Sequence, residues 1–423
     1  MTERLYYADT FLTDFDAVVT DIQELARANG QSLWRVALDR SAFYPTSGGQ
    51  PCDTGTLTAT ARSGAELTAE IVAVEEDESG EVWHHTAKPL LAGTAVRGAI
   101  EPERRWDHAQ QHSGQHLLSA AFVQVCGAPT VSFHLGASVS TIDLAAETLA
   151  QATLDQVEEL ANRILAEDRP ITVRAVSREQ AEALLAAGQL RKLPPRAGDL
   201  RLIEIAGFDL NACGGTHVRS TGQICGLHLR GTEKVRQGIR VEFVCGLRAM
   251  RRAREDFHGL TEAARLLSVR PAEMPDALLR LQTESRQAAK QLQTLTVELA
   301  GYRAAELIRQ TAPQHGARLI TVRLSAAECP DAAYAKLLAS QVTSRAERTI
   351  ALVTWRRESD PGQPATVVFA RSADLDFDCG ALLRRSVTAH AGRGGGSGDM
   401  AQGSVPQEHL SRVVEELLAA SRA

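Results

Sequence analysis

Two short motifs, about a hundred residues apart, could supply ligands to one metal ion. His112 and His116 are four residues apart, so on a helix both imidazoles point to the same side. Cys213 and His217 are also four residues apart, and the two glycines between them permit a tight turn. Imidazole nitrogen and thiolate sulfur are ligands that Zn²⁺ prefers. Together the two motifs predict one zinc ion per chain.

A third histidine leaves the choice of ligands on the helix open. His108 stands four residues before His112, so the spacing alone does not decide which histidines bind the metal. A zinc protease helix would carry a glutamate directly after its first histidine, but Ala109 and Ser113 occupy those positions. The motif therefore lacks the general base of a metalloprotease. Histidines of the core or surface, without any metal, are the alternative interpretation.

Five segments of the sequence resemble the editing and C-terminal regions of alanyl-tRNA synthetases and of free-standing alanyl-tRNA editing proteins. The two motifs lie in segments 112–122 and 213–218, which resemble the zinc-binding signatures of that family. The glycine-rich segment 43–55 resembles the one that precedes the editing domain, and segment 132–136 resembles the part that faces the scissile end of the tRNA. Segment 394–403 resembles the closing motif of the family's C-terminal tRNA-binding domain. The five occur in the family's order over nearly the whole chain.

The resemblance implies roles for individual residues. It gives the zinc ligands as His112, His116, Cys213 and His217. His108 then lies outside the site. Gln115 and His134 would join the two helix histidines in the catalytic group, beside the aminoacyl pocket. Synthetase editing domains usually have a threonine where this chain has Gln115, so either an amide senses the serine hydroxyl or the selectivity differs. The pocket would also be approached by a turn that contains Gly48, Gly49 and Gln50.

The resemblance also implies an activity. The chain would be an ATP-independent hydrolase that deacylates tRNA(Ala) mischarged with serine, and also with glycine. The sequence has no segment before the N-terminal β-like region that is long enough for a synthetase catalytic core. We therefore expect editing in trans without aminoacylation. The expected partner is the mischarged tRNA, with no DNA and no membrane, and a homodimer through the C-terminal domain is a further expectation.

Two other functions fit part of the pattern. A non-catalytic tRNA-binding protein would use the same four ligands for a closed structural zinc site. A phosphoesterase of the Asp-His-His class is suggested only by the glycine-rich C-terminal segment, and the sequence contains no Asp-His-His. Loss of deacylation on zinc removal, with fold and tRNA binding retained, would favour the hydrolase.

The composition indicates an ordinary globular protein of several domains. The chain has 423 residues, of which 44% are hydrophobic and 23% are charged. The N-terminus lacks the basic and apolar regions of a signal peptide, and no apolar stretch is long enough to span a bilayer. Seven scattered cysteines fit a reducing compartment. We therefore expect a cytoplasmic protein.

A net charge of −6 conceals a basic region around the second motif. Residues 186–254 contain 13 Lys and Arg against 5 Asp and Glu. A basic field beside a reactive centre suits a phosphodiester substrate, although any single arginine is more often only a solvated side chain. The backbone of the C-terminal glycine segment could also meet phosphate. The residues expected to bind tRNA are Arg191, Lys192, Arg196, Lys234, Arg236, Arg240, Arg393, Gly394, Gly395 and Gly396.

Helix and strand signals predict an α+β multidomain protein. Short β-like runs between turns predict a small N-terminal β-barrel over residues 1–100. Alternating signals predict an α+β zinc editing domain over 101–246, with the helix ligands inside a helix at 107–126. Residues 247–310 predict a helical hairpin arm, and residues 311–423 predict a C-terminal α/β domain that binds tRNA.

Two further expectations concern the C-terminal half of the chain. Apolar residues between Leu278 and Tyr302 follow the 3–4 alternation of a coiled coil. We interpret this apolar stripe as core within the molecule in preference to a partner surface. Residues 392–398 predict a glycine-rich loop after a helix.

Overall fold

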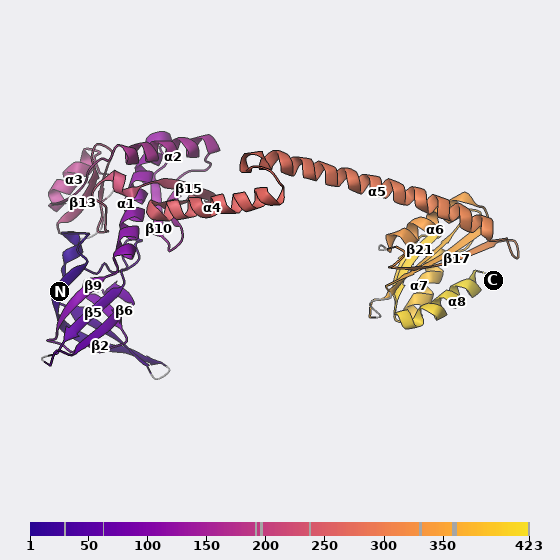
Figure 1. Cartoon of the computed structure of the whole chain (residues 1–423), viewed down its shortest axis with the longest axis horizontal. Helices are drawn as coiled ribbons and strands as arrows, with labels where there is room; N and C mark the ends of the chain where they lie inside the picture. Colours follow the sequence, from indigo (N-terminus) through magenta and orange to yellow (C-terminus); the bar gives the residue numbers. More distant parts are fainter. Residues whose placement is uncertain are drawn as a thin grey trace. The chain divides into compact units, whose positions relative to one another are not determined.

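The described part of the chain forms two compact units, Met1–Ala263 and Ala264–Ala423 (Figure 1). The computed structural model describes residues 1–28, 31–61, 63–190, 193–194, 198–236, 238–329, 332–357 and 362–421. Each unit has its own hydrophobic core. Across these residues, no helix is both long and apolar enough to cross a membrane. The finer division into four domains stays a prediction.

The first unit begins with an antiparallel sheet of seven strands in the order β6-β5-β9-β2-β3-β8-β7. These strands are β2 (Asp14–Ala28), β3 (Gln31–Leu38), β5 (Gly55–Thr60), β6 (Glu66–Ile71), β7 (Ala73–Glu76), β8 (Val82–Thr86) and β9 (Ala95–Ile100). A parallel pair of short strands, β1 (Glu3–Arg4) and β4 (Arg40–Ser41), and the 3-10 helix η1 (Leu5–Tyr7) complete this part.

The seven-stranded sheet surrounds a core but does not close into the predicted barrel. Alternate residues point inward, as Phe15, Ala17 and Val19 do on β2. Among the described strands, no ladder joins the edge strands β6 and β7. Only Val72 separates them along the chain, so the chain turns sharply and the two strands join opposite edges. The backbone N–H of Val72 donates to the carbonyl of His85, which draws these edges together.

Helix α1 (Pro102–Cys126) is the centre of the rest of this unit. Pro102 begins the helix, where its missing N–H costs no hydrogen bond, and Gly127 ends it with a left-handed φ of 66°. Nearly every residue from Arg105 to Phe122 is buried. Because the helix is covered on all sides, it lacks a single apolar stripe and its histidines are held by packing on every face.

Two sheets, three further α-helices and one 3-10 helix complete this unit. The sheets have the orders β10-β11-β16-β15 and β12-β13-β14. Their strands are β10 (Thr130–Leu135), β11 (Ser140–Leu144), β16 (Gly238–Cys245), β15 (Leu227–Val235), β12 (Ile171–Val176), β13 (Leu200–Ile205) and β14 (Asp209–Ala212). The helices are α2 (Gln151–Ala166), α3 (Arg178–Ala186), η2 (Thr221–Ile224) and α4 (Gly246–Leu266). Leu117 and Phe122 of α1 share one core with Ile142 and Phe243 of the larger sheet.

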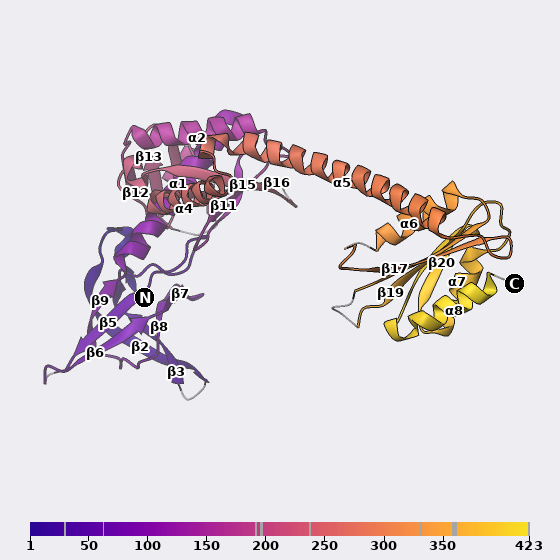
Figure 2. The ribbon, with the colours of Figure 1, turned by 45° about the vertical axis from the view of Figure 1, so that its right-hand side comes forward.

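The second unit has helices on both faces of a five-stranded sheet (Figure 2). The sheet order is β17-β18-β19-β21-β20, and among the described strands of this sheet only the pair β17 and β18 is parallel. The elements are η3 (Pro271–Glu273), α5 (Met274–Gln310), β17 (Arg318–Ser325), α6 (Ala333–Arg345), β18 (Thr349–Arg356), β19 (Ala365–Arg371), α7 (Cys379–Ala389), β20 (Arg393–Gly396), β21 (Met400–Val405), η4 (Gln407–His409) and α8 (Leu410–Ala420). Helices α5 and α6 pack on one face through Ala304 and Leu338, and α7 and α8 pack on the other through Leu383 and Val413.

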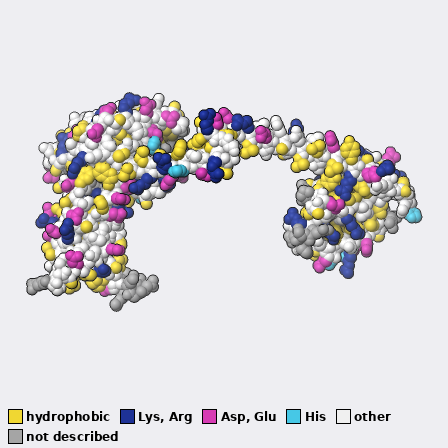
Figure 3. Space-filling view, in the orientation of Figure 1, with side chains coloured by type: hydrophobic (Ala, Val, Ile, Leu, Met, Phe, Trp, Pro, Cys, Tyr) yellow, Lys and Arg dark blue, Asp and Glu magenta, His cyan; other side chains and the backbone are white. Residues whose placement is uncertain are grey.

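The apolar stripe on α5 is not part of the core of its own unit, contrary to the sequence-based interpretation. Leu292, Leu295 and Tyr302 are 68%, 62% and 77% exposed, and Figure 3 shows hydrophobic side chains along this helix. Ala300 and Ala304 of α5 are buried in that core, and Leu307 and Ile308 pack against it. A helix of 37 residues is about 55 Å long, so most of its length extends past the sheet it covers.

The glycine-rich segment is a strand and not the predicted loop. Residues of β20 pair with β21, with Gly394 opposite Gly403 and Gly396 opposite Ala401. A Cβ on Gly396 would lie 2.2 Å from the carbonyl oxygen of Met400. The segment therefore needs glycine because neighbouring backbone lies too close for side chains.

Candidate metal centre

Four side chains from two distant segments meet inside the first unit. Helix α1 presents His112 and His116 on one face, and the turn after β14 presents Cys213 and His217. The ligand atoms of these four residues all lie within 4.8 Å of one another. His112, His116 and His217 are at most 7% exposed. The structure therefore brings together the four residues that the resemblance gives as ligands.

The distances inside this group fit a tetrahedral metal. The Sγ of Cys213 lies 3.3 Å from Nε2 of His112 and 3.4 Å from Nε2 of His217. A tetrahedral zinc with ordinary Zn–N and Zn–S bonds would separate such atoms by about 3.5 Å. Three imidazoles and one thiolate are also the donor types of a zinc site.

Gln50 fixes which nitrogen of His112 is free to bind a metal. The backbone N–H of Thr216 donates to Gln50 Oε1 at 3.1 Å, and Gln50 Nε2 lies 2.9 Å from the Thr216 hydroxyl. Gln50 Oε1 must therefore be an acceptor, and it lies 2.7 Å from Nδ1 of His112. Nδ1 of His112 carries the proton, so Nε2 keeps its lone pair and faces Cys213.

The other two histidines also have polar groups beside Nδ1, an ion-pair contact for His116 and a hydrogen bond for His217. Nδ1 of His116 lies 3.5 Å from the buried carboxylate of Asp209, and Nδ1 of His217 lies 3.1 Å from the hydroxyl of Ser113. Ser113 also accepts the backbone N–H of Val218. Partners at Nδ1 orient the rings of metal-binding histidines and set their tautomers. Asp209, Ser113 and the contact of Gln50 were not predicted from the sequence, because spacing alone does not reveal these partners.

Two glycines allow this close assembly. A Cβ on Gly215 would lie 2.2 Å from Cε1 of His112, so only glycine fits the turn between Cys213 and His217. Gly49 has a φ of 81°, and a Cβ there would lie 2.8 Å from the ring of Phe133. The predicted pocket residues Gly48, Gly49 and Gln50 therefore form a turn that docks against β10 and the metal group.

The charges of the group favour a thiolate. Burial by itself raises the pKa of Cys213, but the three facing imidazoles outweigh this effect and hold that pKa well below its usual value. Burial opposes protonation of His116, yet Cys213 and Asp209 raise its pKa to about 9. Burial lowers the pKa of His217 to about 3. A thiolate beside imidazoles is the state that binds a soft divalent metal.

His108, which the spacing left open, is not in the ligand group. It is 6% exposed, and its Nδ1 has no hydrogen-bond partner in the described part of the chain. Burial lowers its pKa to about 4. The group therefore contains His112 and His116 as its helix members.

The predicted catalytic residues Gln115 and His134 have different environments. Gln115 is 5% exposed and donates to Ser119 at 2.8 Å, while its Oε1 is buried without a partner among the described residues. His134 lies on β10 and is exposed. Gln115 therefore offers an unused acceptor next to a metal ligand, whereas the role of His134 stays a prediction.

A cleft of about 690 Å³ reaches the metal group from the side of Cys213. Tyr7, Ser47 and Arg201 line it. Arg201 donates to the carbonyls of Cys213 and Gly215, both at 2.9 Å, and its buried Nε has no partner among the described residues. Arg201 thus holds the ligand turn, a role that its place in a basic stretch did not indicate.

Comparison with known proteins agrees with this geometry. Residues 200–241, which include Cys213 and His217, match the family described as the threonyl and alanyl tRNA synthetase second additional domain. The alanine–tRNA ligase of Halobacterium salinarum is 34% identical over 307 residues, which cover 72% of this chain and 32% of that protein. The ligase of Methanoculleus marisnigri is 30% identical over 424 residues, covering 98% of this chain and 42% of that protein.

The chain is homologous to regions of alanine–tRNA ligases. It spans about a third to two fifths of the length of these relatives. A solved C-Ala domain of alanyl-tRNA synthetase from Aquifex aeolicus aligns with a TM-score of 0.24 and 16% identity, over 27% of this chain and 99% of that one. That score is too low to define a shared fold.

The residues expected to bind tRNA have varied surroundings. Arg191, Lys192 and Arg196 lie outside the described residues. Lys234 and Arg236 are exposed, whereas Arg240 pairs with Asp143 at 2.8 Å. In the second unit, Arg393 is exposed on the edge strand that also contains the three glycines. Their contacts with RNA stay predictions.

Proposed function

We propose that this protein hydrolyses the ester bond of tRNA(Ala) mischarged with serine, and of tRNA(Ala) mischarged with glycine. It would act in trans, without ATP and without aminoacylation. The observation that carries the proposal is the group of three buried histidines and one cysteine, in a region homologous to the alanine–tRNA ligase editing domain. We place the activity in the cytoplasm, where aminoacyl-tRNA is made and used.

The residues of the group suit ester hydrolysis because an aminoacyl ester is already activated. The side chains need to hold the ester and stabilise the oxyanion that develops on its carbonyl. Zinc, when bound by the four ligands, would supply Lewis acidity for this purpose. Gln50, Asp209 and Ser113 keep the imidazoles in one orientation, which removes the cost of rearranging them during the reaction.

Gln115 is our candidate for sensing the serine hydroxyl. Its Oε1 is buried without a partner among the described residues and can accept one hydrogen bond. A site that satisfies a substrate hydroxyl favours the substrate that has one, because the buried acceptor otherwise stays unpaired. We assign His134 a supporting part in the same pocket, together with the Gly48–Gln50 turn.

The remaining predicted residues would bind the body of the tRNA. Lys234 and Arg236 offer exposed positive charge near the editing region, and Arg393 offers it on the second unit. We keep the division into domains 1–100, 101–246, 247–310 and 311–423 as part of this proposal, with tRNA affinity assigned to the last. Contact at two places on one tRNA raises affinity through effective concentration.

The second candidate is a tRNA-binding protein whose zinc is only structural. Four protein ligands that all approach one point, three of them buried, are typical of a closed structural site. In that case removing the metal would unfold the first unit and no ester would be hydrolysed by the intact protein.

A deacylation assay with four substrates tests the proposal. The zinc-loaded protein is given Ser-, Gly- and Ala-tRNA(Ala) and one unrelated aminoacyl-tRNA. We expect release of serine and glycine to exceed release of alanine. Gln115→Ala should slow the hydrolysis of Ser-tRNA(Ala) more than it weakens tRNA binding. Equal rates on Ser- and Ala-tRNA(Ala) would exclude proofreading, and no hydrolysis by folded, zinc-loaded protein would favour the structural role.

A further inference from the structure

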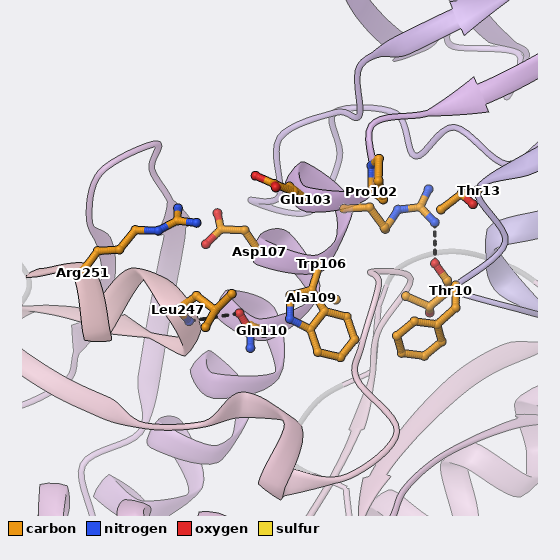
Figure 4. Close-up of a pocket in the computed structure, with 12 residues that line it drawn as sticks. Thr10, Thr13, Pro102, Glu103, Trp106, Asp107, Ala109, Gln110, Leu247 and Arg251 are labelled. Carbon is orange, nitrogen blue, oxygen red and sulfur yellow. Dashed lines mark hydrogen bonds between the residues drawn. The ribbon is translucent and has the colours of Figure 1, made fainter.

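A second cavity in the first unit lies apart from the metal centre (Figure 4). Its volume of about 380 Å³ is in the range of small-ligand sites. It lies between the N-terminal loop, the first turns of α1 and the start of α4, and none of the four metal-group residues lines it. Trp106 precedes His112 by six residues, about 9 Å along the helix axis, so one bound RNA could reach both places.

Two aromatic rings form the wall of this cavity. The ring centroids of Phe11 and Trp106 are 5.5 Å apart, with 49° between the planes. Ala109 and Leu247 extend the apolar surface. The guanidinium of Arg219 stands 4.2 Å from the centroid of Phe11. Flat heterocycles stack on such rings, so the wall suits a planar ligand.

Some polar groups at the cavity are already used by the protein. Gln110 donates to the carbonyl of Gln223 at 2.8 Å and accepts the backbone N–H of Leu247 at 3.3 Å. Asp107 is paired with Arg248. These groups are therefore not available to a ligand without the loss of a hydrogen bond or ion pair.

Three other polar groups are unused. Within the described chain, the indole N–H of Trp106 has no hydrogen-bond partner, and Glu103 and Arg251 have no ion pair. Figure 4 shows Arg251 at one end of the lining residues and Thr10 toward the other, with Trp106 and Glu103 between them. A donor, an acceptor and a cation thus surround an aromatic wall.

We propose that this cavity binds an unpaired nucleobase of the RNA substrate. The base stacks on Trp106, and Arg251 contacts the adjoining phosphate. Glu103 accepts a hydrogen bond from an exocyclic amine, so adenine and cytosine bind more tightly than uracil. An apolar peptide side chain would use the wall and leave all three polar groups unused, which favours RNA as the occupant. The inference rests on the proposed function only for the identity of the RNA.

The test measures binding of uncharged, fluorescently labelled tRNA(Ala) to the full zinc-loaded chain at several salt concentrations. Trp106→Ala should weaken binding about tenfold, whereas Trp106→Phe keeps a stacking face and should stay within about twofold. Arg251→Gln should reduce the slope of log affinity against log salt by about one. Trp34→Ala and Arg254→Gln are the matched controls, because neither residue lines the cavity.

Milder variants and competing oligonucleotides separate loss of base binding from loss of folding. Trp106 also packs against the core, so Arg251→Gln and Trp106→Phe are read alongside Trp106→Ala, with zinc content as a check on folding. Short oligo(C) and oligo(A) should compete with the tRNA better than oligo(U). The proposal is overturned if the three oligonucleotides compete equally with the tRNA. It is also overturned if Trp106→Ala and Arg251→Gln bind tRNA as tightly as their control variants.

The outcome is separable from that of the proposed function because no ester is present in this assay. Weakened binding by the cavity variants, in a protein that hydrolyses no aminoacyl-tRNA, supports the nucleobase site and defeats the editing proposal. Binding of AMP that depends on Trp106 but is not displaced by tRNA overturns the RNA-base proposal, since the cavity would then serve a free nucleotide.

Discussion

The metal centre and the glycine strand β20 both come from glycine-rich motifs, yet their glycines have different functions. Gly215 gives room to the ring of His112, a side chain that carries chemistry. Gly396 gives room to neighbouring backbone, and β20 presents little besides main-chain groups and Arg393. A motif therefore predicts function best when its glycines make space for reactive side chains. Where they make space for backbone, the same composition predicts mainly close packing.

The largest expected effect is the loss of the metal on removing its thiolate. Cys213→Ala should lower zinc affinity by more than about 100-fold, because the ligand itself contributes more than the groups that orient ligands. Zinc content of the purified protein, measured by elemental analysis, checks this. Cys126→Ala, an exposed cysteine outside the group, should keep its zinc. Full zinc content in the Cys213 variant would remove Cys213 from the site.

A somewhat smaller effect should follow from changing Gln50. Gln50→Leu removes the acceptor that fixes the tautomer of His112, so zinc affinity should fall about 10- to 100-fold. Competition with a chromophoric chelator measures this affinity. Gln151→Leu, on the exposed start of α2, serves as the control. Equal zinc affinity in the two variants would show that the turn at Gln50 does not support the metal centre.

The sequence predicted the metal ligands but not their supports, for a physical reason. His112, His116, Cys213 and His217 are recognisable because their types and spacing suit one ion. Gln50 reaches His112 only because its turn docks on β10, a long-range contact that no local pattern contains. The prediction of a closed barrel and the prediction that the α5 stripe is buried were wrong for the same reason. Strand closure and the covering of a helix depend on which distant elements meet.

Acid should weaken the first unit through a buried histidine away from the metal. His84 is fully buried, and burial lowers its pKa from 6.5 to about 4. As the pH falls, His84 takes up a proton in the unfolded chain before it does so in the folded chain. Its contribution to the free energy of unfolding is therefore complete above pH 6.5 and is lost as the pH falls toward 4. At pH 5 the loss is about 2 kcal/mol, or about 30-fold in the folding equilibrium constant.

Urea unfolding at pH 7.5 and pH 5 measures this loss, followed separately in the two units by hydrogen exchange. His84→Asn, which cannot take up a proton, should show a smaller difference between the two pH values. The same pH dependence in the variant would assign the effect to other groups.

The smallest expected effect belongs to the glycine strand. Arg393→Gln should weaken tRNA binding only a few-fold and reduce the salt slope by about one, since a single phosphate contact is lost. Arg412→Gln, on the exposed side of α8, is the control. Unchanged affinity and slope for Arg393→Gln would separate this edge of the second unit from RNA binding.

The most direct test of the central claim is the release of serine from Ser-tRNA(Ala) by one preparation before zinc removal, after it, and after zinc is restored. The account predicts hydrolysis with zinc, loss of hydrolysis without it, and recovery on restoring it, while Ala-tRNA(Ala) stays intact throughout. Serine release that continues at the same rate without zinc, or alanine release at the rate of serine release, would contradict it.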